Sequence, residues 1–473
     1  MVGMVHSNGH IPALPTAEEF SHDFLASHAS TGSLYRRALW VTGALFALGV
    51  VGFIIRAMAD GFDSDARGPW GYYAATVAFL LTTAGAAPVV AMVLRLVKAH
   101  WRRPMTRVAE IYGAVGLLTL LMFIPLLFLI PSASGRRTIW FQDHEGTLGM
   151  GTDGKIFGAP HVYDALALLF LVICGLGLLY ISALPDMATM RDRGVGRAKG
   201  FVARIGGRWH GTWREWQVSR TAVNFLGVFY FMLFVYTISL FSIDFSVSLV
   251  PGWRDAIYPT FQALNGLQAG LAITLVTLYL VRRFGNLERY IGVDQFWGAS
   301  KMLLALSLLW FYFWWSGFIV FWYGRAPVEL DLIQLLMFGP YRYVFISAFA
   351  LNFVIPFGIL LWNSVRKTVW GPALAGASIL VGTLLDKTRL YVPAWSVTDS
   401  LEEHALTSIP STNYPDIPDL MMVVGGISGA VFLWLLISKV VPVLSLWEVK
   451  EGITLRTVRR YLRRDIIVHG KPE

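Results

Sequence analysis

The sequence predicts an all-α integral membrane protein with about ten transmembrane helices. Long apolar stretches recur through its 473 residues, and 55% of the residues are hydrophobic while only 15% are charged. Lys and Arg also gather on every second connection between the stretches. A hydrocarbon core about 30 Å thick needs about 20 apolar residues of helix, because lipid offers no partner for an unpaired backbone group.

The apolar stretches meet or approach that length in order along the chain. They cover residues 39–57, 71–97, 108–130, 162–184, 221–248, 256–281, 299–323, 338–364, 370–385 and 419–442. A polar arm, 1–38, precedes them and a basic tail, 443–473, follows them. The ninth stretch is the shortest, so nine or eleven crossings stay open as alternatives.

The distribution of cations predicts the orientation, because Lys and Arg resist translocation across the membrane. They lie before the first stretch, after the second, fourth, sixth and eighth, and in the tail. The other connections carry acids, such as Asp60 and Asp63, or are rich in Pro and Gly. Both termini are therefore expected in the cytoplasm. The net charge of +9 then reflects contact with anionic lipid, and no nucleic-acid binding is expected.

Two residue types exclude several redox centres from this chain. Cys174 is the only cysteine, so neither a disulfide nor a Cys-ligated iron–sulfur cluster is expected. The ten histidines lie in tails, in loops or at the mouths of the predicted helices. Haem and copper sites in membranes rest on imidazoles within helices, so we expect no haem and no metal here.

Ionisable residues at membrane depth are costly and are therefore the candidate functional residues. Asp164 opens the fourth predicted helix, with Tyr163 beside it and His161 three residues earlier, on the same helical face. Asp164 is interpreted either as a helix N-terminal carboxylate or as the acceptor of protons released by a quinol at the outer face.

Further candidates lie on later helices. Asp244, Asp386 and Lys301 are candidates for a proton path, with structural pairing as the alternative for the acids and snorkelling for Lys301. Asp386 is expected to form an internal ion pair with its neighbours Lys387 and Arg389. The aromatic run 309–315 is interpreted as packing, with a cofactor cage as the alternative.

Seven motifs in order carry a resemblance to a known family. They are RGPWGYY at 67–73, WRRPMTRVAE at 101–110, LPDMATMRDR at 184–193, SIDFSVSLVPGW at 242–253, GPY at 339–341, NFVIP at 352–356 and PVLSLWEVK at 442–450. Together they resemble the NrfD/polysulfide reductase (PsrC) membrane-subunit family, most closely its branch in the quinol-oxidising alternative complex III. The resemblance covers about residues 30 to 450.

The resemblance implies two four-helix bundles, 71–248 and 256–392, flanked by helices at 39–57 and 419–442. It implies a quinone or menaquinone near the extracytoplasmic face of the first bundle, bound by Tyr163, Asp164 and His161, with Asp164 and His161 as the catalytic pair. Electrons would pass to an extracytoplasmic iron–sulfur or molybdopterin-type subunit. A multihaem cytochrome c and a second NrfD-like membrane subunit are further expected partners, in a bacterial cytoplasmic membrane.

This chain departs from the family pattern at two positions. Members carry a histidine before an Ala–Gly in the second helix, where this chain has Thr83. They carry another in a Pro–x–x–His pattern, where this chain has Phe128. Three alternatives therefore stay open: a membrane anchor, a proton-conducting paralogue without a working quinone site, and a secondary transporter.

Overall fold

The computed structural model describes residues 16–29, 32–63, 67–130, 160–193, 206–207, 209–397, 405–461 and 464–469. The longer helices are α2 Ser33–Asp60, α3 Gly71–Thr83, α4 Ala87–Leu96, α6 Tyr112–Leu129, α7 Pro160–Asp192, α9 Trp213–Asp244, α10 Tyr258–Phe284, α11 Val293–Gly324, α16 Trp370–Ser396 and α17 Ile417–Val440. The shorter ones are α1 Ala17–Ala29, η1 Gly68–Trp70, η2 His100–Arg102, α5 Arg103–Glu110, η5 Val247–Leu249, α12 Pro327–Ile333, η6 Gln334–Phe338, α13 Arg342–Phe349, η7 Ala350–Val354, α14 Ile355–Leu361, α15 Asn363–Arg366 and α18 Leu446–Thr454.

The protein is an all-α, multi-pass membrane protein. Within the described residues, nine helical segments are long and apolar enough to cross a bilayer. They correspond to all the predicted stretches except the ninth, 370–385. That stretch lies in α16, a 27-residue helix whose Asp386, Lys387 and Arg389 reduce its apolar character. A helix of this length extends for about 40 Å, so α16 is long enough to cross as well.

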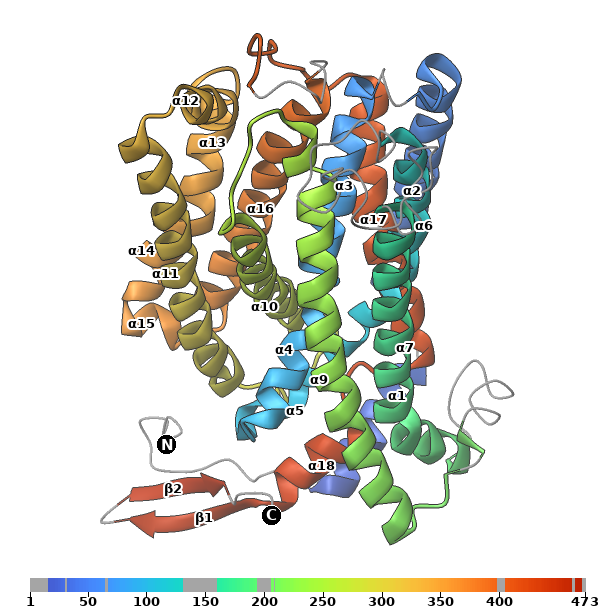
Figure 1. The fold of residues 1–473 in the computed structure, drawn as a ribbon. Helices are drawn as coiled ribbons and strands as arrows, with labels where there is room; N and C mark the ends of the chain where they lie inside the picture. Colours follow the sequence, from blue (N-terminus) through green and yellow to red (C-terminus); the bar gives the residue numbers. More distant parts are fainter. Residues whose placement is uncertain are drawn as a thin grey trace.

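The long helices run up and down between two ends of the molecule (Figure 1). The helices α1 and α18 lie at one end, which we call the terminal end. The segment α12 lies at the other end, which we call the distal end, and α15 lies back toward the terminal end. The helices α13 and α14 connect these two segments, and α16 returns in the opposite direction.

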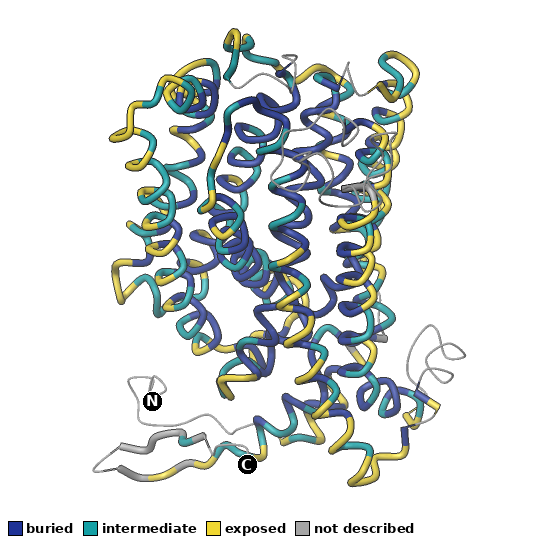
Figure 2. Tube along the Cα trace, viewed as in Figure 1, coloured by how far each residue is buried: buried dark blue, intermediate teal, exposed yellow. Residues whose placement is uncertain are grey.

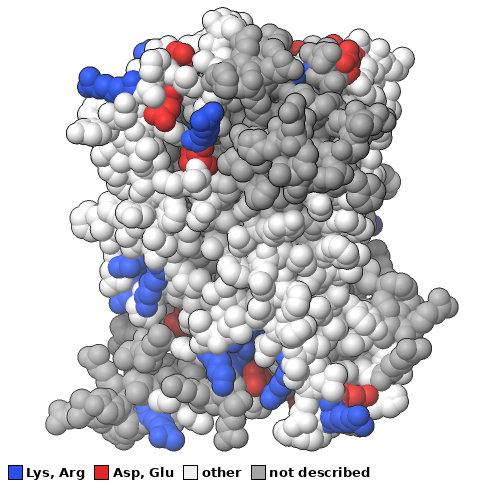
Figure 3. Space-filling view, viewed as in Figure 1, with Lys and Arg blue, Asp and Glu red and all other residues white. Residues whose placement is uncertain are grey.

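Burial and charge follow this arrangement. The central helices α3 and α10 are buried along much of their length, whereas helices at the rim expose one side (Figure 2). Many of the exposed side chains of α2 are large and apolar, among them Trp40, Ile54 and Met58. On the face in Figure 3, charged side chains lie toward the two ends and an uncharged band separates them. This pattern is typical of a surface surrounded by lipid.

Two helices close to the chain ends pack tightly together. The helices α2 and α17 lie side by side, and Gly49 lies directly against Gly425. A Cβ atom on either glycine would overlap the Cα of the other. Small residues allow this close approach of helix backbones in membranes, where van der Waals contact replaces the hydrophobic effect as the driving force.

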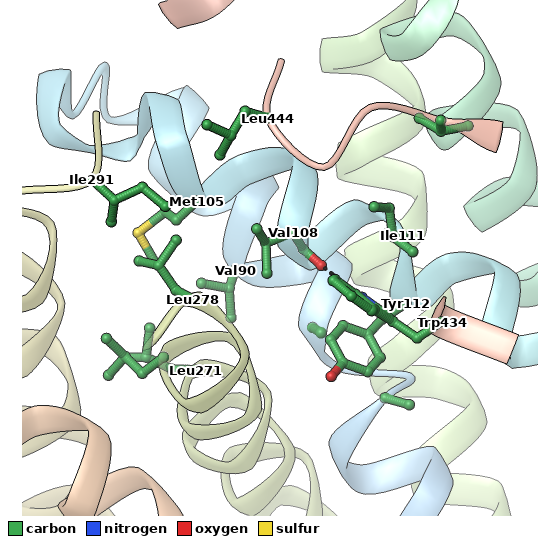
Figure 4. Packing of buried hydrophobic residues seen from close by; sticks show 14 of the residues in the cluster. Val90, Met105, Val108, Ile111, Tyr112, Leu271, Leu278, Ile291, Trp434 and Leu444 are labelled. Atoms are coloured by element: carbon green, nitrogen blue, oxygen red, sulfur yellow. Dashed lines mark hydrogen bonds between the residues drawn. The ribbon is translucent and has the colours of Figure 1, made fainter. Parts of the chain in front are cut away.

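Aliphatic and aromatic side chains fill the interior near the terminal end. Met105, Val108 and Ile111 from the α5 region meet Leu278 of α10 in one buried cluster (Figure 4). The indole of Trp434 donates a hydrogen bond of 3.3 Å to the Val108 carbonyl oxygen. This bond attaches α17 to α5.

The two terminal segments contain regular structure. In the predicted arm, Phe20 and Phe24 of α1 are buried, and the Tyr290 hydroxyl donates to Asp23 at 3.0 Å. In the predicted tail, α18 is followed by one hairpin, in which β1 Arg456–Tyr461 pairs antiparallel with β2 Arg464–His469. Part of each segment therefore packs on the helices.

Candidate functional site

The two candidates at the start of α7 face different sides of the helix. Asp164 is 2% exposed, whereas Tyr163 is 54% exposed. Successive residues on a helix point about 100° apart, so the structure does not bring these two side chains together. The side chain of His161 lies outside the described part of the chain, and its pairing with Asp164 stays a prediction.

Asp164 contributes to the electrostatic surroundings of a buried tyrosine on another helix. That residue is Tyr391 of α16, which is 2% exposed and whose ionisation is also influenced by Asp386 and Tyr258. One turn farther along α16, the Trp395 indole donates to the Phe245 carbonyl oxygen at 3.0 Å. A carboxyl group and a phenol from distant parts of the sequence therefore share one buried region near the distal end.

Asp244 lies near the same end, at the last residue of α9. It is 4% exposed, and its backbone carbonyl accepts a hydrogen bond of 2.8 Å from the Ser248 hydroxyl. The neighbouring Phe245 carbonyl is the acceptor for Trp395 described above. The end of α9 is thereby attached to α16, the helix that also carries Tyr391.

The predicted ion pair on α16 is present. Arg389 Nη2 lies 2.6 Å from Asp386 Oδ1, and the Asn265 amide donates to Asp386 Oδ2 at 3.4 Å. The Lys387 ammonium donates to the side-chain oxygen of Gln262. All three ionisable residues are at most 2% exposed, so each charge is held by a polar partner inside the protein.

Lys301 lies apart from this cluster. Its residue is exposed, and its ammonium lies 3.6 Å from the ring centroid of Trp297, which also faces Lys367 at 5.3 Å. The described partners of Asp386 are Arg389 and Asn265, on α16 and α10, and Lys301 is not one of them. The structure therefore does not bring the three proton-path candidates together.

A row of buried amides on α10 was missed in the sequence reasoning. Gln262, Asn265 and Gln268 are 0% exposed and recur every third residue, so they share one face of the helix. Gln268 donates to the Ser307 hydroxyl and to the Asn352 carbonyl oxygen, both at 3.0 Å. The signal in the sequence is the spacing of these amides within an apolar helix, since the cost of burying ionisable groups does not select uncharged side chains.

A second missed feature lies near the terminal end. We call it the basal ion cluster, and it consists of Arg95, Arg107, Glu110, Asp186 and Glu448, all buried. Arg95 Nε lies 3.0 Å from Glu448, Arg107 Nη2 lies 3.0 Å from Asp186, and Arg107 Nε lies 3.2 Å from Glu110. These contacts bind α18 to α4, α5 and α7.

The cluster holds the Glu448 carboxyl in its charged form. Burial by itself raises the pKa of Glu448, but the charges of Arg95 and Arg102 outweigh it and lower the pKa to about 2. Arg102 Nη1 lies 2.9 Å from the same carboxylate. Four residues of the cluster fall within three of the motifs, at 101–110, 184–193 and 442–450, and Arg95 precedes the first of these by six residues. From the sequence alone, Arg95 and Arg107 indicate only the orientation of the chain.

The two positions without the family histidines differ in their surroundings. Thr83 is fully buried at the end of α3, and its hydroxyl donates to the Phe79 carbonyl oxygen at 2.7 Å. Phe128 is 67% exposed on α6. Neither side chain replaces a titratable imidazole.

An apolar groove runs between the flanking helices and the first predicted bundle. It is lined by residues of α2, α3, α6 and α17, including Phe53, Tyr73, Met122 and Met422. Its empty volume is about 700 Å³, including its open side. The Tyr73 hydroxyl donates to the Met122 carbonyl oxygen at 2.7 Å, so the groove presents carbon atoms almost throughout.

The described residues contain no group of three or more His, Cys, Asp or Glu side chains arranged to hold a metal ion. Cys174 is buried as a free thiol, and its sulfur donates to the Leu226 carbonyl oxygen at 3.3 Å.

No protein-family model matches this sequence, and a search of curated proteins finds no match either.

Proposed function

We propose that this chain is a quinol-interacting integral membrane subunit of a respiratory or photosynthetic electron-transfer complex. It would belong to the NrfD/polysulfide reductase family and be most similar to ActC of alternative complex III. Support comes from the seven ordered motifs and from Asp164, an acid kept 2% exposed at the end of a membrane helix. Keeping a carboxyl group there is costly, which favours a functional role.

The proposed fold has two four-helix bundles between two flanking helices. Contacts support this: α6 packs on α7 and α7 on α9 in the first half, while α10 packs on α11 and α16, and α13 packs on α16, in the second. The flanking helices α2 and α17 pair with each other. With α16 included, the chain would cross the membrane ten times. Both termini would then lie on the cytoplasmic side of a bacterial cytoplasmic membrane.

The single observation that carries the proposal is the shared environment of Asp164 and Tyr391. A bound quinol or menaquinol supplies two electrons and two protons when it is oxidised. Asp164 would accept a proton from a ring hydroxyl, because a partly desolvated carboxylate is a stronger base than one in water. The Tyr391 hydroxyl would orient that carboxylate, and the groove beside Tyr73 would hold the isoprenoid tail.

The electrons would leave toward an extracytoplasmic iron–sulfur or molybdopterin-type partner, with a multihaem cytochrome c and a second NrfD-like subunit as further components. The polar loop 131–161, with Arg136, Arg137 and His144, is the proposed docking segment. Residues 131–159 lie outside the described part of the chain, so this assignment rests on sequence alone.

Proton translocation is part of the proposal, with Asp244, Asp386 and Lys301 as its candidates. The amide row of α10 supports a polar route from Asp386 toward mid-depth, through Asn265 and then Gln268. The Lys301 ammonium faces the Trp297 ring. Lys301 would therefore join such a route only through additional polar groups.

The test replaces Asp164 with Asn and measures quinol oxidation by the purified assembly. Asn keeps the size of the side chain and its capacity to accept hydrogen bonds but carries no charge, so a purely structural acid would leave turnover unchanged. Loss of a proton acceptor should instead lower kcat by at least about 100-fold. The matched control is Asp192→Asn at the other end of α7, where the side chain is 64% exposed and bonds only to Arg191 among its described partners. Unchanged turnover in Asp164→Asn would contradict the proposal.

The alternative is that the chain is an anchor, a proton-conducting paralogue or a transporter. One observation supports a role in transport. The helix path is interrupted between α3 and α4 and again by the π-helical turn η7, as in membrane proteins that bind ions at broken helices. Proteoliposomes containing this chain alone distinguish the alternatives. Uptake of protons or a labelled solute, together with full turnover in Asp164→Asn, would support the alternative.

A further inference from the structure

A second cavity lies in the other half of the molecule. It is bounded by α10, α11, α12, η6 and α16 near the distal end, and its empty volume is about 560 Å³, including its mouth. Its wall is largely aromatic and includes Trp253, Phe261, Trp314 and Phe318. No lining residue belongs to α7, the helix that carries Asp164, or to α9. The lining residue Tyr258 is nevertheless part of the electrostatic surroundings that Tyr391 shares with Asp164.

Polar donors without a partner line this cavity. Trp253 is 6% exposed and Arg389 is 2% exposed, yet within the described structure the Trp253 Nε1 and Arg389 Nε atoms have no hydrogen-bond partner. The same holds for Trp314 Nε1. A buried donor without an acceptor costs about 1–3 kcal/mol. A ligand that brings acceptor oxygens into the cavity would remove this cost.

Arg389 is held rigidly at the polar side of the cavity. Its Nη2 bonds to Asp386 at 2.6 Å, its Nη1 donates to the Leu336 carbonyl oxygen at 3.5 Å, and its guanidinium lies 5.2 Å from the Phe345 ring centroid. Leu336 belongs to η6, a π-helical turn, and such turns occur frequently at functional sites. The arrangement fixes the direction of the remaining donor.

The charges around the cavity favour an uncharged ligand. The carboxylate of Asp386 already balances Arg389, and the carboxylate of Asp255 accepts the backbone N–H groups of Ile257 and Tyr258 at 2.9 and 3.0 Å. An anionic headgroup would find no excess positive charge in the lining, and it would lie near the carboxylate of Asp255. A flat ring with carbonyl oxygens instead matches both the aromatic wall and the indole donors.

We propose that this cavity binds the headgroup of a quinone, at a site separate from the one at Asp164. The headgroup ring lies against the aromatic wall, and its carbonyl oxygens accept from the Trp253 indole and the Arg389 guanidinium. The inference extends the proposed function, but it does not depend on a working site at Asp164. No electron or proton transfer is assigned to this cavity.

Gly317 offers a way to fill the cavity without disturbing the fold. It lines the cavity, and a Cβ atom added there would meet no atom within 4 Å. Gly317→Phe should therefore occupy the space of the ligand. Gly358 on α14 is the matched control, because a Cβ atom there also meets nothing within 4 Å and Gly358 does not line the cavity.

The experiment uses the full chain, purified in lipid nanodiscs and irradiated with a photoreactive short-chain menaquinone analogue, followed by peptide mapping. We expect label on residues 313–337, displaced by unlabelled menaquinone. Gly317→Phe should reduce that label at least tenfold, Gly358→Phe should retain it, and Asp164→Asn should leave it unchanged. Trp253→Phe keeps an aromatic ring but removes one donor, so it should raise the apparent Kd about fivefold.

Three results would overturn the inference. The first is a wild-type chain without label on residues 313–337. The second is equal labelling in Gly317→Phe and Gly358→Phe. The third is label that added phospholipid displaces and menaquinone does not, which would identify an ordinary lipid crevice. Loss of label near residue 164 alone bears on the proposed function and not on this cavity.

Discussion

Replacing Glu448 with Gln should release α18 from the terminal end of the molecule. The substitution keeps the shape of the side chain but removes its charge. Glu448 is fully buried, and its carboxylate receives Arg95 at 3.0 Å, Arg102 at 2.9 Å and the Thr106 hydroxyl. Removing one partner of a buried ion pair costs about 3–5 kcal/mol, because the remaining charge stays buried without compensation.

The assay is limited proteolysis of the segment that follows α18, combined with thermal unfolding in detergent. The control is Glu451→Gln on the same helix, whose side chain is 25% exposed and lies 3.2 Å from Arg103. This control should cost less than about 1 kcal/mol. Equal cleavage rates and equal Tm values for the two variants would refute the role assigned to the basal ion cluster.

The same carboxyl predicts how docking of α18 depends on pH. The pKa of Glu448 is about 2 in the folded protein, below its ordinary value of 4.5. The folded state therefore favours the charged form, and its stabilisation is complete above pH 4.5 and is lost as the pH falls from 4.5 toward 2. Glu448→Gln should remove this part of the acid sensitivity. An unchanged acid profile in that variant would contradict the assignment.

Two further predictions concern helix packing and the terminal arm. Gly425→Ala places a methyl group against Gly49 and should cost about 1–3 kcal/mol through overpacking, measured as a lower Tm, whereas Gly358→Ala should not. Burial and the charge of Lys439 lower the pKa of His28 to about 4, from an ordinary value of 6.5. The docked arm thus favours the neutral imidazole, and its stabilisation is lost as the pH falls from 6.5 to 4. Hydrogen exchange of α1 should rise over that range, and a flat profile would disprove the assignment.

The sequence was sufficient to predict the membrane class and nearly every apolar helix. The predicted ends of the stretches differ from the observed helix ends where charged side chains are paired inside the protein. The ninth stretch was ended at 385, whereas α16 continues to Ser396, because Asp386 and Arg389 neutralise each other. The eighth stretch was expected to be one helix, but it is divided by η7. A π-helical turn depends on local packing, and the composition of the stretch does not indicate it.

The burial of individual acids was predictable, because the cost of burial acts on a single residue. Asp164, Asp244 and Asp386 were selected by that cost, and all three are at most 4% exposed. The basal ion cluster was not predictable, because Arg95 and its partner Glu448 are separated by 353 residues. A rule that treats each cation as solvated cannot distinguish the buried Arg95 from Lys301, which faces Trp297 at the surface.

Arg389 takes part both in the proposed proton path, through Asp386, and in the proposed quinone cavity. Its geometry allows both roles at once. A guanidinium carries five N–H donors in a fixed plane. One donor is used by Asp386 and one by the Leu336 carbonyl, and the Nε donor stays available for a ligand. An acceptor in the cavity therefore does not compete with the ion pair on α16. Filling the cavity should leave Asp386 paired, so that effects on proton movement and on ligand binding remain separable in the same protein.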